Sequence, residues 1–159
     1  MALRFQPPHP FPHLSLPDLE GAERPFVTAW AARPALFVFG HRDCVTSRMT
    51  LPFVDRIHHR RPPTSTVVAV LQDAAADARA FVEELALELP VRLEEDPYPL
   101  AARLGLGTVP TLFLVTPRGR IDAVAEAFRR ADLEAFAARL QVPPPLFLPG
   151  DDAPALRPG

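Results

Sequence analysis

Short, continuous apolar runs alternate along the chain with longer segments in which apolar residues recur at helical spacing. The continuous runs cover residues 35–39, 64–72, 90–93 and 111–115. Runs of this kind are typical of strands that are buried on both faces of a sheet. After a turn at residues 117–120, residues 121–128 predict one further, antiparallel strand.

Helical spacing occurs between and after these strands, over residues 45–59, 73–89 and 130–140. In the first helix, the face expected to lie on the sheet comprises Val45, Met49, Pro52, Phe53, Arg56 and Ile57. The alanine-rich second helix is expected to pack through Ala80, Phe81, Leu85 and Leu89. The last helix carries Leu133, Phe136, Ala137 and Leu140 on one stripe. Strands that alternate with helices in this way predict an α/β fold.

Composition and charge limit the class of protein. The 159 residues suffice for one domain with a single well-filled core, and 48% of them are apolar. With 17 basic residues against 19 acidic ones, the chain has no overall positive field that would favour nucleic acid. No apolar run approaches the roughly 18 residues that a membrane span needs, and residues 1–13 lack the apolar centre of a secretory signal. We therefore expect a cytoplasmic protein without nucleic-acid or membrane partners.

The only cysteine, Cys44, lies where the strand over residues 35–39 gives way to the helix over residues 45–59. A single cysteine cannot close an intramolecular disulfide, so no disulfide framework holds the fold. At the start of a helix, unpaired backbone N–H groups and the positive end of the dipole favour a thiolate over a thiol. This position suits a nucleophile, a mixed-disulfide former or an anion contact.

Charged neighbours of Cys44 act on the thiol in opposite directions. The carboxylate of Asp43 disfavours the thiolate, whereas Arg42 and Arg48 favour it. Asp43 is also a candidate N-cap of the helix. His41 is a candidate proton donor or cationic neighbour; the alternative is an exposed loop histidine without such a role.

Two motifs carry a resemblance to a known family. The string CVTSRMTLP at residues 44–52 is similar to the CPPCRxxLP motif of thioredoxin-like proteins of the TlpA/ResA and AhpC/TSA kind. Downstream, GTVPTLFLV at residues 107–115 resembles their GVPTxFLI motif. The resemblance implies a thioredoxin fold, in which helices flank a central mixed sheet. It places Cys44 in the attacking position and Ser47 in the resolving position of a degenerate CxxS site, with Pro110 as a cis-proline that packs against the cysteine.

The same resemblance implies the domain organisation. The string FPHLSLPDLEGAERPF at residues 11–26 resembles the PDFTLPDLDGKxV opening of these families, which forms an N-terminal β-hairpin with its turn here at residues 18–21. We expect a proline-rich arm over residues 1–13, extended or loosely packed, a thioredoxin-like domain over residues 14–140, and a proline-rich tail over residues 141–159. Leu146, Phe147 and Leu148 are expected to pin the tail to the body or to a second subunit.

Departures from the family pattern bear on the mechanism. In a dithiol reductase, the second cysteine attacks the mixed disulfide; Ser47 cannot do so, because a hydroxyl at neutral pH is not an adequate nucleophile. The buried acid that thioredoxin carries six residues before its cysteine is replaced here by Val38, and the usual tryptophan before the cysteine is replaced by Asp43. Ordinary two-cysteine turnover is therefore excluded.

Three functions remain open. In the first, Cys44 is a monothiol that forms mixed disulfides, Ser47 donates a hydrogen bond to its sulfur, and an external thiol resolves the adduct. In the second, the fold is a binding module that uses the same groove without turnover. The third is a one-cysteine peroxidase, which is disfavoured because Phe37 and His41 occupy the proline and threonine positions of the PxxxTxxC motif. We expect thiol redox chemistry, by a small margin over binding.

The expected partner is a small thiol such as glutathione, or a protein thiol or disulfide. Besides Cys44 and Ser47, the candidate substrate groove comprises Val109, Pro110, Asp43, Arg48 and His41. No cofactor and no metal is expected. The resemblance implies that the acidic residues 94–96 start a short helix, here at residues 99–104, and the adjacent His58 and His59 lack a ligand spacing. The oligomeric state stays open, and an edge strand together with the apolar tail is compatible with a homodimer.

Overall fold

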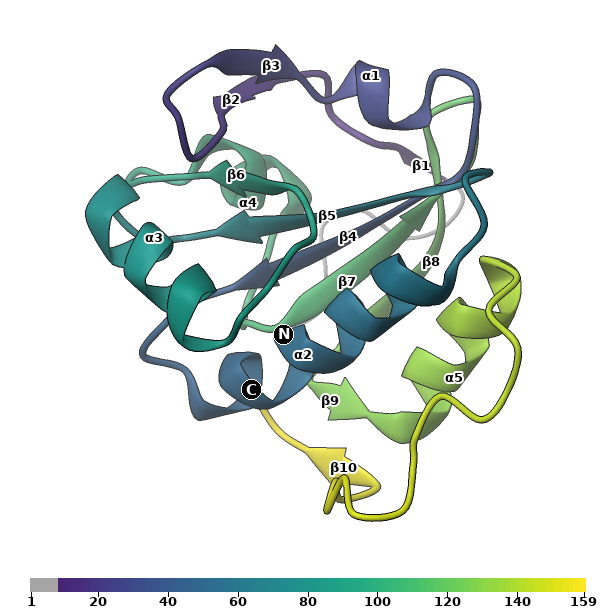
Figure 1. The fold of residues 1–159 in the computed structure, drawn as a ribbon. Helices are drawn as coiled ribbons and strands as arrows, with labels where there is room; N and C mark the ends of the chain where they lie inside the picture. Colours follow the sequence, from purple (N-terminus) through teal and green to yellow (C-terminus); the bar gives the residue numbers. More distant parts are fainter. Residues whose placement is uncertain (1–8) are drawn as a thin grey trace.

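The computed structural model describes residues 9–159, in which a six-stranded sheet is covered by helices on both faces (Figure 1). The sheet order is β1-β8-β7-β4-β5-β6, with β1 (His9–Pro10), β4 (Ala35–Gly40), β5 (Thr66–Leu71), β6 (Val91–Leu93), β7 (Thr111–Val115) and β8 (Arg120–Glu126). Strands β4, β5 and β6 are parallel, whereas β7 and β8 run antiparallel to their neighbours. This is the mixed sheet that the sequence predicted.

Strand β4 lies inside the sheet, and its side chains alternate between two apolar clusters. Leu36 and Val38 pack with α2 (Val45–Arg60), α3 (Ala75–Glu84) and α5 (Arg130–Arg139) on one face. Phe37 and Phe39 pack on the other face, under α1 (Val27–Trp30), α4 (Pro99–Leu104) and the N-terminal segment. Because both faces are covered, the strand is apolar throughout.

The face by which α2 meets the sheet differs from the prediction. Phe53 and Ile57 are buried as expected, but Val45 is 58% exposed, and the polar residues Ser47 and Thr50 are buried instead. The predicted face included neither of these polar residues, but each has a hydrogen-bond partner inside the protein, which removes most of the cost of burial.

Helix α3 is shorter than predicted and ends at Glu84 rather than at Leu89. Leu89 is still buried, but from a non-helical segment. The Asp55 carboxylate on α2 accepts the backbone N–H groups of Glu88 and Leu89 at 2.9 and 2.8 Å. These bonds replace the intrahelical partners that a longer helix would have supplied.

The N-terminal segment contains the predicted hairpin, formed by β2 (Ser15–Pro17) and β3 (Glu23–Pro25). Upstream, β1 pairs antiparallel with β8, and Phe11 is fully buried. The segment is therefore extended, as expected, but its buried aromatic residue was not predicted. The first eight residues of the predicted arm lie outside the described part of the chain.

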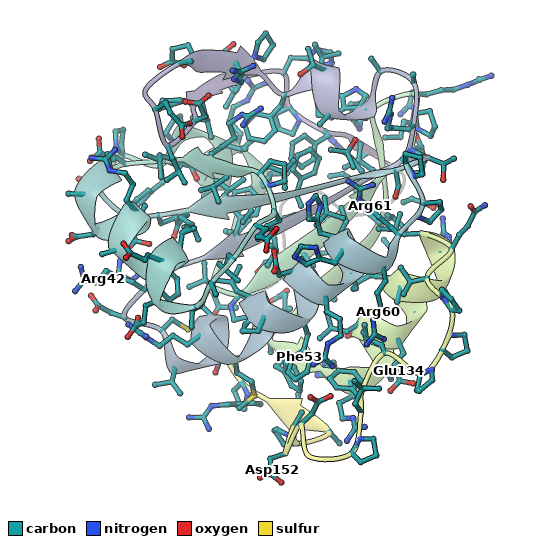
Figure 2. All side chains as sticks on the ribbon, in the orientation of Figure 1. Arg42, Phe53, Arg60, Arg61, Glu134 and Asp152 are labelled. Carbon is teal, nitrogen blue, oxygen red and sulfur yellow. The ribbon has the colours of Figure 1, made fainter. Side chains whose placement is uncertain are left out.

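The C-terminal segment folds back along α2 and α5. Leu146 and Phe147 are buried, with the Phe147 ring centroid 4.7 Å from that of Phe53, whereas Leu148 is 41% exposed. Figure 2 shows Phe53 and Arg60 on the side of α2 that faces this segment, and Arg60 donates to the Pro145 carbonyl. The tail is thus pinned to its own body. Strand β10 (Leu156–Arg157) then pairs with β9 (Phe128–Arg129).

An ion pair between Arg56 and Asp151 fixes the middle of the C-terminal segment. Arg56 donates to both carboxylate oxygens of Asp151 at 2.8 and 3.0 Å, and these bonds lower the pKa of Asp151 to about 2. An acid whose folded pKa is depressed stabilises the fold above its unfolded pKa and loses that contribution as the pH falls through the folded value. We expect Asp151→Asn to lower the melting temperature by a few degrees at pH 7, and the difference to shrink between about pH 4 and pH 2. Thermal unfolding of both proteins over this pH range measures the difference in melting temperature. A difference that does not change with pH would contradict a role for the Asp151 carboxylate charge.

Candidate functional site

Cys44 is the N-cap residue of α2, in the loop that follows the central strand β4. Its side chain is partly exposed, and its sulfur accepts the backbone N–H of Ser47 at 3.3 Å. The prediction that Asp43 is a candidate N-cap is wrong: the Asp43 side chain is 78% exposed, and the N-cap is the next residue, Cys44. The cysteine itself therefore takes the position at which a helix N-terminus acts most directly on a side chain.

Two backbone groups contact the sulfur and favour different protonation states. The Ser47 N–H donates to it, which stabilises a thiolate. The thiol in turn donates to the Val109 carbonyl oxygen at 3.4 Å, which stabilises the neutral form. Val109 precedes a cis peptide bond to Pro110, so the turn of the second motif lies directly against the cysteine of the first.

The Ser47 hydroxyl does not play the part predicted for it. Ser47 is fully buried, and its hydroxyl oxygen accepts the His41 backbone N–H at 3.2 Å. The contact of Ser47 with the sulfur comes from the backbone N–H. The hydroxyl thus holds the loop between β4 and α2 in place, while the backbone supplies the hydrogen bond to sulfur.

A histidine and a buried carboxylate lie beside this loop. The Nε2 atom of His41 is 3.5 Å from Asp73 Oδ1, and the Asp43 backbone N–H donates to His41 Nδ1 at 3.0 Å. Because Nδ1 accepts a hydrogen bond, the proton of the neutral ring lies on Nε2, toward Asp73. Burial raises the pKa of Asp73, although the Arg42 backbone N–H donates to its carboxylate. Asp73 was not among the residues singled out from the sequence.

The two arginines near Cys44 connect this loop to α3. The guanidinium of Arg48 donates to the Arg42 carbonyl and to Glu84, both at 2.7 Å, and lies over the Phe81 ring. Arg42, which Figure 2 labels beside α3, pairs with Asp77 at 2.6 Å. These contacts position the loop and engage the Arg48 guanidinium with Arg42, Glu84 and Phe81.

A cavity of about 570 Å³ lies on the other side of the Val109 turn. Its lining includes Gln72, Tyr98, Leu106, Thr108 and Val109. Nearby, Glu94 is buried and accepts the backbone N–H groups of Leu100 and Ala101 at the start of α4. Burial raises the pKa of Glu94. Its carboxylate caps the short helix, which agrees with the structural role predicted for residues 94–96.

The described residues contain no group of three or more histidine, cysteine or acidic side chains that could hold a metal ion. Across residues 9–159, no helix is long and apolar enough to cross a membrane. A feature that the sequence did not reveal lies on the open side of Cys44: a shallow pocket is shared by Cys44, Thr46 and residues of the C-terminal segment.

The order of strands, the cysteine at the start of the first long helix and the cis-proline turn against it define a thioredoxin fold with an N-terminal hairpin. Neither a protein-family model nor a curated protein sequence matches the chain.

Solved structures match the whole fold at low sequence identity. A candidate protein disulfide isomerase from Bacteroides thetaiotaomicron is 12% identical, with a TM-score of 0.79 over 89% of this chain and 91% of that one. The thioredoxin domain of a thiol-disulfide oxidoreductase from Bacteroides vulgatus is 19% identical, with a TM-score of 0.72 over 90% and 99% of the two chains. A secreted Mycobacterium tuberculosis disulfide oxidoreductase is 18% identical, with a TM-score of 0.69 over 80% and 96%. At these identities the likeness shows the fold alone.

Proposed function

We propose that the protein acts in thiol redox chemistry through Cys44 alone, as a monothiol that forms mixed disulfides. The observation that carries the proposal is the placement of a partly exposed sulfur at the N-cap of a long helix, where it accepts the Ser47 N–H. Both the hydrogen bond and the helix dipole favour the nucleophilic thiolate. The solved structures of the same fold include thiol-disulfide oxidoreductases, which supports a thiol or disulfide as partner.

The chemistry proceeds by two exchanges. The Cys44 thiolate attacks one sulfur of a disulfide; a bond forms between this sulfur and Sγ, the original S–S bond breaks, and the departing thiolate takes a proton from solvent. An external thiolate, from glutathione or a protein, then attacks the substrate sulfur of the mixed disulfide and releases Cys44 as thiolate. The second thiol comes from outside because Ser47 occupies the resolving position.

The test is the pH dependence of Cys44 alkylation, followed by mass spectrometry, with and without oxidised glutathione. We expect alkylation at pH 7 to be faster than that of a cysteine in an unstructured peptide, and a glutathione adduct that a dithiol removes. The Cys44→Ser variant should give neither product. Alkylation no faster than that of the peptide, without any adduct, would overturn the proposal.

A binding role without turnover is the second candidate. It is favoured by the hydrogen bond from the thiol to the Val109 carbonyl, because this contact stabilises the unreactive neutral form. The same alkylation experiment separates the two, since a pure binding module would retain an ordinary, slowly reacting thiol. Peroxide reduction is the least supported function, because Phe37 is a core residue and His41 pairs with Asp73. The cytoplasmic location and a homodimer stay predictions.

A further inference from the structure

The C-terminal segment of the chain lies over the groove beside Cys44. In Figure 1 the label of the C-terminus stands next to the start of α2, beyond strand β10. The pocket at the sulfur is lined by Cys44, Val45 and Thr46 on one side and by residues 156–159 on the other. The segment reaches this place because β10 pairs with β9, which brings Arg157 opposite Phe128.

Thr46, two residues after the cysteine, makes both polar contacts that join α2 to the end of this segment. Its hydroxyl donates to the Pro158 carbonyl at 2.5 Å and accepts from Arg157 Nε at 3.2 Å. Thr46 is 3% exposed although its hydroxyl has no role inside α2, whereas the equivalent hydroxyl of Thr50 bonds back to the Thr46 carbonyl. The Thr46 hydroxyl therefore serves the contact with the tail.

Gly159 lies against the turn at Thr108 and Val109, which also contacts the Cys44 sulfur. A side-chain carbon built on Gly159 would overlap the Val109 carbonyl oxygen and the Thr108 hydroxyl. The backbone of the segment thus approaches the same Val109 carbonyl to which the Cys44 thiol donates. A larger residue at this point would require the segment or the Val109 turn to shift.

The segment is nonetheless weakly held. Residues 154–159 are all exposed, and Leu156 is 48% exposed, so little apolar surface is buried by their docking. The firm anchors, Leu146, Phe147 and the Arg56–Asp151 pair, lie upstream of it. Residues 156–159 can therefore leave the groove without unfolding the body.

We propose that residues 156–159 are an intramolecular occupant of the Cys44 groove, in the place that an extended substrate peptide would take. Small disulfides reach the sulfur past the segment, whereas a protein chain must displace it. The groove accordingly accepts an extended backbone with a small residue against Val109 and a cation near Thr46. The consequence for disulfide exchange rests on the proposed function, but occupation of the groove does not.

The test compares the full chain with a chain that ends at Ala155, which keeps the Arg130 N–H bond to the Ala155 carbonyl and all upstream anchors. Alkylation of Cys44 is measured with iodoacetamide and with a maleimide on a long polyethylene glycol chain. Truncation is expected to raise the rate with the bulky reagent by about tenfold relative to the small one, equivalent to about 1.4 kcal/mol of protection. An added peptide with the sequence of residues 156–159 should restore protection. Equal rate ratios in both chains would overturn the proposal.

Point variants test the same contacts without shortening the chain. Thr46→Val removes the hydroxyl and should raise the rate with the bulky reagent, whereas Thr46→Ser keeps the hydroxyl and should not. Arg157→Ala should raise the rate with the bulky reagent as Thr46→Val does. The control is Arg103→Ala, which removes an exposed arginine of α4 away from the groove and should leave the rate unchanged. If truncation alters the rate ratio but no glutathione adduct forms, the occupied groove stands and the redox function fails.

Discussion

The Ser47→Cys substitution is expected to let Cys44 close an intramolecular disulfide and to give the protein dithiol reductase activity. The two positions are the N-cap and the third residue of α2, and the Ser47 backbone nitrogen already lies 3.3 Å from the Cys44 sulfur. A thiol at position 47 supplies the internal nucleophile that the mixed disulfide lacks. We expect reduction of a protein disulfide by a dithiol reductant to rise from background by at least an order of magnitude, measured as turbidity in an insulin assay.

The controls separate this effect from the mere addition of a thiol. Val45→Cys adds a second cysteine at an exposed position next to Cys44 and should not turn over substrate. The double variant Cys44→Ser, Ser47→Cys keeps one thiol and should be inactive. Because Ser47 is fully buried and its hydroxyl accepts the His41 N–H, the substitution should also cost about 1 to 2 kcal/mol of stability. A folded Ser47→Cys protein without a 44–47 disulfide would show that the geometry, not the missing thiol, prevents dithiol chemistry.

Much of the fold could be predicted because its strands are buried on both faces. Residues of β4 and β7 must be apolar whichever way they point, so their extents follow from the sequence within a residue. The proximity of Cys44 to Val109 and Pro110 followed from the resemblance, which supplied a long-range contact that periodicity cannot give.

The parts that could not be predicted depend on contacts between distant segments. Helix α3 was expected to continue because Leu89 falls on its apolar side, but the Asp55 carboxylate from another helix takes the N–H groups of Glu88 and Leu89. The partner of the Ser47 hydroxyl, and the burial of Asp73 beside His41, likewise depend on loop geometry. Residues 156–159 have no periodicity that would place them over Cys44; their position is set by pairing with β9.

Phe11→Ala is expected to be the most destabilising single change of those proposed, although the residue lies within the arm predicted over residues 1–13. The Phe11 ring is fully buried and stacks on that of Phe37, with ring centroids 4.7 Å apart. It also meets the rings of Trp30 and Phe113 edge-on, at 5.4 and 6.0 Å. Truncation of a buried phenylalanine removes its transfer energy and leaves a cavity, so we expect a loss of about 3 to 5 kcal/mol in the free energy of unfolding.

Denaturant unfolding of Phe11→Ala measures this loss, and Val27→Ala serves as the control because that apolar side chain is 36% exposed and should cost far less. The magnitude also locates the domain boundary. A loss in the expected range means that the folded unit begins no later than Phe11, because a side chain that stabilises the core cannot belong to a detachable arm. A loss below about 1 kcal/mol, typical of a surface substitution, would mean that residues 9–13 separate from the body, and would restore the predicted boundary at residue 14.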